Sequence, residues 1–192
     1  MKGDETEALR ARLDDLARHA GRLWTPLCSR FLTQEERSLA QRCARENGVL
    51  AAFDGGWEGA ERSQCCFYPD GLEPDFTGVW LEVSWNAKFA SVDHRALLGS
   101  VMALGMDRSL LGDMVIEGDH AYIRAVPELA ARLPQELTRV GSAAVKVRER
   151  SEPPAITPPK GTELRDTVAS LRLDSVLSSG MKTSRAKATE WI

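Results

Sequence analysis

The stretch TGVWLEVSW, residues 77–85, sets the pattern for the middle of this 192-residue chain. Apolar side chains alternate with other residues along it, which is typical of a half-buried β-strand. The segment DHRALLGSVMAL at 93–104 then has apolar residues at helical spacing, behind an aspartate that can cap a helix. The two segments together predict a strand followed by a helix that packs on it.

The segments that follow extend this pattern. LGDMVIEG (111–118) and DHAYIRAV (119–126) predict two strands, joined by a tight turn at Gly118 and Asp119. PELAARLPQEL (127–137) predicts a helix interrupted by Pro134, and SAAVKVRER (142–150) predicts a final strand. The order β-α-β-β-α-β indicates an α+β fold of the ferredoxin-like type, which RNA-recognition domains share.

The first part of the chain, residues 1–75, predicts an N-terminal helical segment plus a β-hairpin. Apolar residues at helical spacing favour a helix over residues 5–24, and Thr33 with Glu36 has the form of a capping box that opens a second helix. Two short strands follow, on either side of the glycine-rich loop DGGWEG at 54–59.

A proline-rich segment divides the rest of the chain. SEPPAITPPKGTE at 151–163 indicates a semi-rigid linker. We therefore expect it to separate an RNA-recognition-like (RRM-like) α/β domain at 76–150 from a small C-terminal unit at 164–192. In that unit, one short apolar helix precedes a glycine turn and a second helix, which Thr183 or Ser184 can cap.

Composition excludes several classes of protein. The net charge of −3 means that any nucleic-acid contact must come from local basic patches. No run of about 20 apolar residues and no signal-peptide core occurs, so a cytoplasmic location without a membrane span is expected. The four cysteines show no CxxC spacing, so we expect reduced thiols and neither a zinc site nor a cofactor.

Three sites are candidates for binding an anion. Lys88, His94 and Arg95 gather between the first central strand and its helix, whose N-terminus favours anions, although a solvated charged loop explains them equally well. The loop DGGWEG with Arg62 can cradle an anion, but a hairpin that needs positive φ explains its glycines as well. The C-terminal unit is locally basic: Arg172, Lys182, Arg185 and Lys187 outnumber Asp174 and Glu190.

The central sheet offers a different kind of site. If its first and third strands are neighbours, Trp80, Tyr122 and Arg124 share the outer face, and bases stack on such platforms. The N-terminal helices are an alternative cover for that face.

Two sets of residues carry a resemblance to a known family. Arg172-Leu173-Asp174 followed by SRAKA at 184–188 resembles the opening of an S4 RNA-binding domain. Upstream, GGWEGAER (55–62), WNAKF (85–89), the segment 94–118 and VGSAAVKVRE (140–149) resemble the YlmH-type S4 proteins, which are bacterial RNA-binding proteins. The resemblance runs from about Phe31 to the end of the chain.

The resemblance implies a non-catalytic protein that binds structured RNA, namely ribosomal RNA and tRNA on the large ribosomal subunit, in ribosome quality control. The RNA-binding residues that it implies are Arg172, Asp174, Lys182, Ser184, Arg185 and Lys187 in the C-terminal unit, and Lys88, His94, Arg95, Arg108 and Arg62 upstream. S4 domains continue into a strand hairpin that this sequence lacks, so a truncated S4 domain is expected. The family shows H-R-D at His94-Arg95-Ala96 and a basic pair at Asp107-Arg108, so we expect a weaker positive patch here.

Two other functions stay open. Pseudouridine synthases also carry S4 domains and use an R-L-D aspartate, which would make Asp174 catalytic. Its position at the opening of a helix instead favours a role in the electrostatics of the helix N-terminus. The third possibility is an adaptor whose N-terminal helices bind a cell-division protein.

Overall fold

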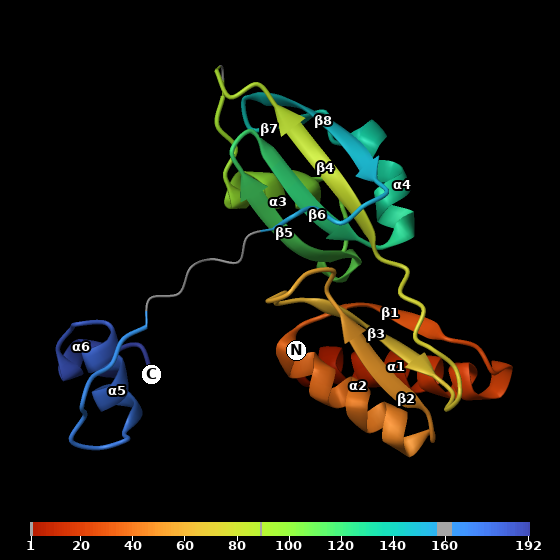
Figure 1. The fold of residues 1–192 in the computed structure, drawn as a ribbon, viewed down its shortest axis with the longest axis horizontal. Helices are drawn as coiled ribbons and strands as arrows, with labels where there is room; N and C mark the ends of the chain where they lie inside the picture. Colours follow the sequence, from red (N-terminus) through yellow and green to blue (C-terminus); the bar gives the residue numbers. More distant parts are fainter. Residues whose placement is uncertain (1, 89, 157–162) are drawn as a thin grey trace. The chain divides into compact units, whose positions relative to one another are not determined.

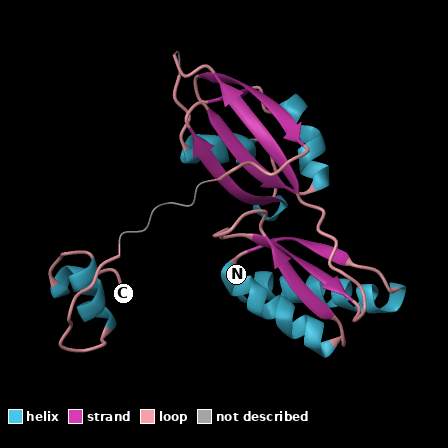
Figure 2. Cartoon of the chain, in the orientation of Figure 1, coloured by secondary structure: helices cyan, strands magenta, loops and turns pink. Residues whose placement is uncertain are grey.

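The computed structural model describes residues 2–88, 90–156 and 163–192. Phe89 in WNAKF and residues 157–162 of the predicted linker lie outside the described residues. The chain divides into two compact units, Met1–Ile156 and Thr157–Ile192 (Figure 1). The first unit contains two antiparallel sheets, and the second contains two short helices (Figure 2).

The N-terminal part of the first unit is a three-stranded sheet with two helices. Its elements are α1 (Lys2–Leu23), β1 (Leu27–Leu32), α2 (Gln34–Glu46), β2 (Leu50–Asp54) and β3 (Ser63–Tyr68), with the strand order β1-β3-β2. Both helices contribute to a core of buried side chains that includes Leu13, Ala17, Leu32, Cys43 and Phe67. The hairpin of β2 and β3 was expected, and the added strand β1 was not.

The predicted capping box at the start of α2 is confirmed. The Glu36 backbone N–H donates to the Thr33 hydroxyl oxygen at 3.3 Å, and the Thr33 N–H donates to the Glu36 carboxylate at 2.7 Å. The helix ends at Glu46, and Gly48 has a φ of +67°, in the left-handed region that glycine adopts easily.

The central part of the first unit has the predicted α+β order. Its elements are β4 (Val79–Trp85), α3 (His94–Ala103), a 3₁₀ turn η1 (Arg108–Leu110), β5 (Leu111–Glu117), β6 (His120–Ala125), α4 (Pro127–Glu136), β7 (Arg139–Val140) and β8 (Ala143–Arg150). The sheet order is β5-β6-β4-β8-β7 with every pair antiparallel. Without the two-residue β7, this is the strand order of a ferredoxin-like sheet.

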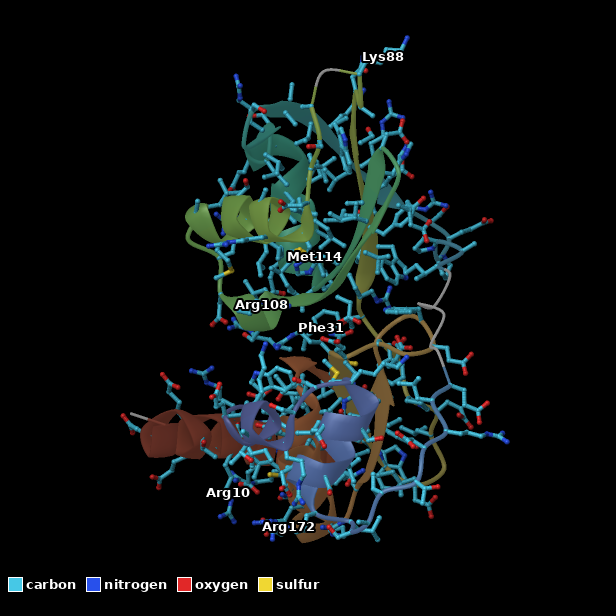
Figure 3. The ribbon with its side chains drawn as sticks, turned by 90° about the vertical axis from the view of Figure 1, so that its left-hand side faces the viewer. Arg10, Phe31, Lys88, Arg108, Met114 and Arg172 are labelled. Atoms are coloured by element: carbon cyan, nitrogen blue, oxygen red, sulfur yellow. The ribbon has the colours of Figure 1, made fainter. Side chains whose placement is uncertain are left out.

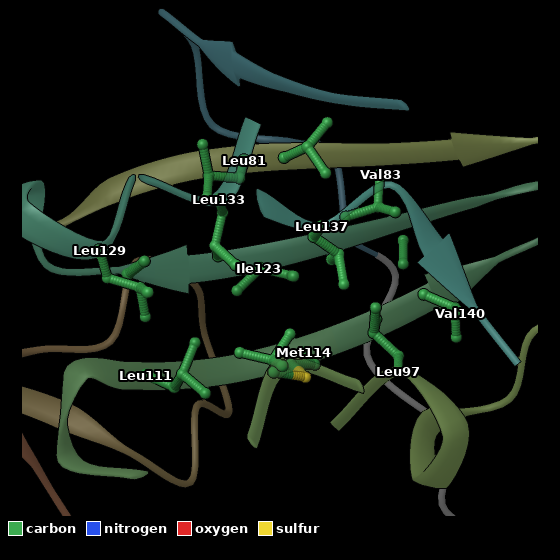
Figure 4. Close-up of a cluster of buried hydrophobic side chains, with 14 of the residues drawn as sticks. Leu81, Val83, Leu97, Leu111, Met114, Ile123, Leu129, Leu133, Leu137 and Val140 are labelled. Atoms are coloured by element: carbon green, nitrogen blue, oxygen red, sulfur yellow. The ribbon is translucent and has the colours of Figure 1, made fainter. Parts of the chain in front are cut away.

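Helices α3 and α4 cover one face of this sheet and leave the opposite face, here called the outer face, without a helix (Figures 1 and 3). Between helices and sheet lies a core of large apolar side chains (Figure 4), which includes Leu81, Leu97, Leu111, Ile123, Leu129 and Leu133. After β8 the chain turns back across the outer face (Figure 1), and Pro154 in that segment is buried.

The expected interruption of the second central helix at Pro134 is wrong. Helix α4 runs through this residue to Glu136. Proline lacks an N–H donor and strains the preceding turn. The helix keeps its apolar contacts nonetheless, because Leu129, Ala130 and Leu133 are all buried against the sheet.

The C-terminal unit consists of α5 (Leu173–Gly180) and α6 (Arg185–Thr189). Ser184 caps α6 by accepting the Lys187 N–H at 3.2 Å, so Ser184 rather than Thr183 supplies the cap. Lys182, in the turn between the helices, has a φ of +49°. Several large apolar side chains of this unit are exposed, among them Leu171, Met181, Trp191 and Ile192.

None of the helices in the described ranges is long and apolar enough to cross a membrane. The four cysteines are free thiols, and Cys28 is the one that is partly exposed.

Gly112 on β5 provides a test of how closely the two sheets of the first unit meet. A Cβ atom there would lie 2.7 Å from the Phe31 Cε1 atom of β1, and both residues are buried. We expect Gly112→Ala to lower the free energy of unfolding by about 1–3 kcal/mol, because overpacking forces ring or backbone to move. Urea denaturation measures this change.

Gly99→Ala is the matched control. Gly99 lies in α3, and a Cβ atom there would meet nothing within 4 Å. This variant should be as stable as the original chain, or more stable by up to about 1 kcal/mol, because alanine favours helix. Equal stability of Gly112→Ala and Gly99→Ala would contradict the packing.

Candidate nucleic-acid interface

The glycine-rich loop DGGWEG binds a carboxylate of its own chain. The Trp57 indole N–H donates to Asp113 Oδ2 at 3.2 Å, and the Glu61 backbone N–H donates to the same oxygen at 2.9 Å. The Arg62 backbone N–H donates to Asp113 Oδ1 at 3.1 Å. The anion bound by Trp57 of the loop and by the two residues Glu61 and Arg62 after it is therefore Asp113 of β5, and these N–H groups are not free for a phosphate.

Arg62 and Arg108 support the same junction. The Arg62 guanidinium donates to the carbonyls of Leu111 and Phe31, at 3.1 and 2.9 Å. The Arg108 guanidinium donates to the carbonyls of Leu111 and Gly112, at 2.9 and 3.2 Å. Burial lowers the pKa of both groups. Arg62 thus donates to both β1 and β5, and Arg108 donates to β5.

The outer-face platform of Trp80, Tyr122 and Arg124 is only partly open. The Arg124 guanidinium lies over the Trp80 ring at 5.4 Å and donates to the Asp54 carboxylate at 3.2 Å. Gly56 of the glycine-rich loop, with a φ of +90°, lies so close that a Cβ atom would be 2.8 Å from Trp80 Cζ2. Trp80 is 3% exposed. The cover is this loop, whereas the N-terminal helices were the expected alternative.

The uncovered part of the outer face is basic along β8. In register with β4, Lys146 lies opposite Ser84, Arg148 opposite Glu82 and Arg150 opposite Trp80, so the three basic residues share a face. Arg150 donates to the Glu82 carboxylate at 2.6 Å and lies over the Tyr122 ring at 5.4 Å. Lys146 and Arg148 are exposed and, among the described residues, have no acidic partner.

Lys88 lies at the tip of the loop that joins β4 to α3, away from the helix (Figure 3). It lines an open hollow of about 700 Å³ together with Ser84, Asn86, Asp119 and Lys146. His94 and Arg95 are exposed in the first turn of α3, where Asp93 caps the helix by accepting the Ala96 N–H at 2.7 Å. The structure therefore places Lys88 near Lys146, a residue that was not among those predicted to bind RNA.

The alternation in VKVRER was the signal that could have identified this group. Lys146, Arg148 and Arg150 follow one another at every second residue, so a strand must place them on one face.

Asp107 stands where the family resemblance implies a basic residue. It caps η1 by accepting the Ser109 N–H at 2.8 Å, and it pairs with Arg30 at 3.4 Å. The bonds to Ser109 lower the pKa of Asp107.

In the C-terminal unit, Asp174 holds the two helices together. The Arg185 guanidinium donates to Asp174 Oδ2 from Nε at 3.1 Å and from Nη2 at 2.6 Å, and Arg172 Nε donates to Oδ1 at 3.3 Å. The hydrogen bond from Arg185 lowers the pKa of Asp174. Lys182 and Lys187 are exposed and, in the part of the unit that the structure covers, have no acidic partner.

The described residues contain no group of three His, Cys, Asp or Glu side chains placed to hold a metal ion. Exposed cations without an acidic partner among the described residues occur in both units, and such groups attract anionic ligands.

Comparison with known proteins points in the same direction. Residues 72–152 match the family described as "Putative RNA-binding domain in YlmH". The chain is 34% identical over 162 residues to the "Ribosome-associated protein quality control protein P2" of Bacillus subtilis, a match that covers 82% of this chain and 63% of that protein. The chain thus spans less than two thirds of this relative's length.

A solved structure shares the fold. The "Cell division protein ylmH from Streptococcus pneumoniae" superimposes with a TM-score of 0.62 and 22% sequence identity, over 76% of this chain and 91% of that one. This likeness supports the α+β architecture described above.

The carboxylate of Asp113 can be tested without any ligand. We expect Asp113→Asn to lower the free energy of unfolding by about 1–3 kcal/mol, because an amide replaces one acceptor oxygen with an N–H₂ group facing N–H donors. Urea denaturation measures the loss, and hydrogen exchange at the Glu61 and Arg62 amides should become faster. Asp70→Asn, at an exposed turn, is the control and should change neither. Slow exchange retained in Asp113→Asn would contradict the proposed role of Asp113.

The ion pair of Asp174 predicts a pH dependence. Because its pKa is lowered in the folded state, Asp174 stabilises the helix pair at neutral pH, and this contribution is lost as the pH falls below about 4, through the folded pKa. NMR shifts of the Arg185 Nε–H and the Ser184 amide should follow that titration. Asp174→Asn should remove the pH dependence of these two signals. If the signals titrate identically in both proteins, the ion pair does not form.

Proposed function

We propose that this chain is a non-catalytic RNA-binding protein that acts on the ribosome, because residues 72–152 match the family described as "Putative RNA-binding domain in YlmH" and the Bacillus subtilis relative is ribosome-associated by name. The observation that carries the proposal is this domain match. The unpaired, exposed cations on both units are the structural feature that supports it, since phosphate contacts dominate the affinity of RNA-binding proteins.

The proposed contacts differ in kind. In the C-terminal unit, Lys182, Lys187 and Arg172 contact phosphates. Ser184, Asp174 and Arg185 are positioning residues, because their polar groups already cap α6 or join it to α5. A guanidinium held by a carboxylate on one side still offers its remaining N–H groups to a phosphate, so Arg185 keeps a secondary contact role.

In the first unit, Lys88, His94 and Arg95 are the proposed contacts of the central domain. Arg62 and Arg108 act indirectly, because they hold β1 and β5 in place through carbonyl acceptors. Binding at several separate patches suits a chain whose net charge is −3, since no continuous basic surface is needed.

The finer assignment concerns the RNA itself. We propose ribosomal RNA and tRNA on the large ribosomal subunit, in the quality control of stalled ribosomes in the cytoplasm. The name of the Bacillus subtilis relative supports the ribosome and its quality control, and the family resemblance implies the large subunit and the tRNA.

The enzymatic alternative would use Asp174 as a nucleophile. Its carboxylate is 14% exposed and accepts hydrogen bonds from two arginines, which stabilise the charge and leave little of it open to a substrate. We therefore propose that Asp174 is structural. Formation of pseudouridine in RNA incubated with the chain would contradict this proposal.

Salt dependence tests the RNA-binding function. The chain should bind purified large ribosomal subunits, and log K should fall linearly with log salt, with a slope of about 0.7–0.9 per phosphate contact. Co-sedimentation over a salt series measures this slope. Binding that is the same at low and high salt would overturn the proposal.

A single charge in the C-terminal unit sharpens that test. Lys187→Gln should raise Kd for the subunit about threefold to tenfold and reduce the salt slope by about one contact. Arg165→Gln is the matched control, since Arg165 is exposed in the same unit but pairs with Glu163 at 2.8 Å. Equal effects of both substitutions would mean that only net charge matters.

A further inference from the structure

The outer face of β8 carries two cations, Lys146 and Arg148, that are not among the RNA-binding residues implied by the family resemblance and that form no ion pair among the described residues. We propose that Lys146 and Arg148, together with the hollow beside Lys88, form a second RNA-contact surface that binds the backbone of a single-stranded segment. This inference rests on the proposed RNA-binding function and adds the surface and the form of RNA.

The geometry of the strand sets the spacing of the charges. Because residues two apart on a strand point to the same face, Lys146 and Arg148 are separated by about 6.6 Å along β8. Pairing with Ser84 and Glu82 of β4 fixes both on the outer face. The segment after β8 crosses that face beyond Arg150 (Figure 1), and Lys146 and Arg148 stay exposed.

The acids near these cations already have partners. Glu82 accepts from Arg150 at 2.6 Å and lies 3.8 Å from His120, and Asp119 lies 2.6 Å from the His120 ring. Glu117 also has an interaction of its own. The charges of Lys146 and Arg148 are therefore not compensated locally by an ion pair, which leaves them for an external anion.

The hollow next to Lys146 has room for one nucleotide. Its volume of about 700 Å³ falls within the range of small-molecule sites. Its lining combines two ammonium groups, from Lys88 and Lys146, with the polar side chains of Ser84 and Asn86 and one carboxylate, that of Asp119. Trp85 also borders the hollow, but its side chain is 8% exposed and belongs to the hydrophobic core. The hollow therefore offers ammonium and polar groups to a phosphate and its sugar, as in grooves that follow the nucleic-acid backbone.

A structural explanation competes with this proposal. Past Ala144, β8 has β4 on one side and, within the described residues, no strand on the other. Charged side chains on such an edge prevent pairing with another chain. On that explanation, removing the charges would promote self-association and leave RNA affinity unchanged.

Two double variants of the full chain separate the explanations. Lys146→Gln with Arg148→Gln removes two charges from the outer face. Arg132→Gln with Arg139→Gln removes two charges from α4 and β7, where Arg132 pairs with Glu136 at 2.8 Å and Arg139 donates to the Ser142 carbonyl at 3.3 Å. The probe is a fluorescein-labelled single-stranded RNA of about 16 nucleotides, titrated by fluorescence anisotropy at several salt concentrations.

We expect the outer-face variant to raise Kd about tenfold or more and to reduce the salt slope by about 1.4, which is two contacts at 0.7 each. The control should change Kd by less than about threefold. Equal losses in both variants, or no loss in the outer-face variant, would overturn the inference. If polyglutamate of matched charge competes as well as unlabelled RNA, the surface binds acidic polypeptides and the inference is wrong.

Crosslinking keeps the test valid if the outer-face variant folds poorly. The unsubstituted chain is irradiated with the same RNA carrying 4-thiouridine, and the crosslinked peptides are identified by mass spectrometry. Crosslinks within residues 84–88 or 144–150 support the inference, and their absence alongside crosslinks elsewhere overturns it. A chain that binds neither this RNA nor ribosomal subunits would instead refute the proposed function.

Discussion

The first unit depends on one carboxylate. Asp113 accepts N–H groups from Trp57, Glu61 and Arg62, and so fastens the glycine-rich loop of one sheet to the edge of the other. The pairing of β5 with β6 shifts in register between Leu111 and Met114, the interval that contains Asp113. Such a bulge changes the direction in which a side chain points relative to regular alternation. The neighbouring Gly112 leaves room for the Phe31 ring. Once this junction forms, the same loop covers Trp80 and Arg124, so the architecture that joins the two sheets also decides which part of the outer face stays open.

Local periodicity explains how much of this could be predicted from the sequence. The central strands and helices have clear periods of two and 3.6 residues, and their order allowed the α+β fold to be predicted. Strand β1 was not predicted, because a register shift between Cys28 and Phe31 breaks the alternation of its side chains. Asp113 was not predicted as the acceptor at the glycine-rich loop for a different reason. It lies about fifty residues away in the chain, and the sequence DGGWEG does not indicate which anion is bound. Pairing across such distances is a property of the fold.

The basic residues show the same division. By sequence alone, Arg62, Arg108 and Lys88 look alike as candidates for a phosphate. The structure separates them, because the two arginines donate to backbone carbonyls at the junction, whereas the lysine is exposed at a loop tip. Burial has a cost for a charged group that only internal acceptors offset. A cation with satisfied donors is therefore part of the scaffold, and the unpaired ones are what an RNA would meet.

Two small basic surfaces can together bind more tightly than either does alone. The chain places exposed cations on β8 and the loop after β4 in one unit, and in the turn between α5 and α6 and on α6 in the other. The proline-rich sequence 151–163 lies between the two units in the chain. When one surface has bound an RNA, the second meets it at an effective concentration set by the linking segment. Because the net charge is −3, attraction to a polyanion depends on these local surfaces, and an RNA that reaches both gains over a polyanion that reaches only one.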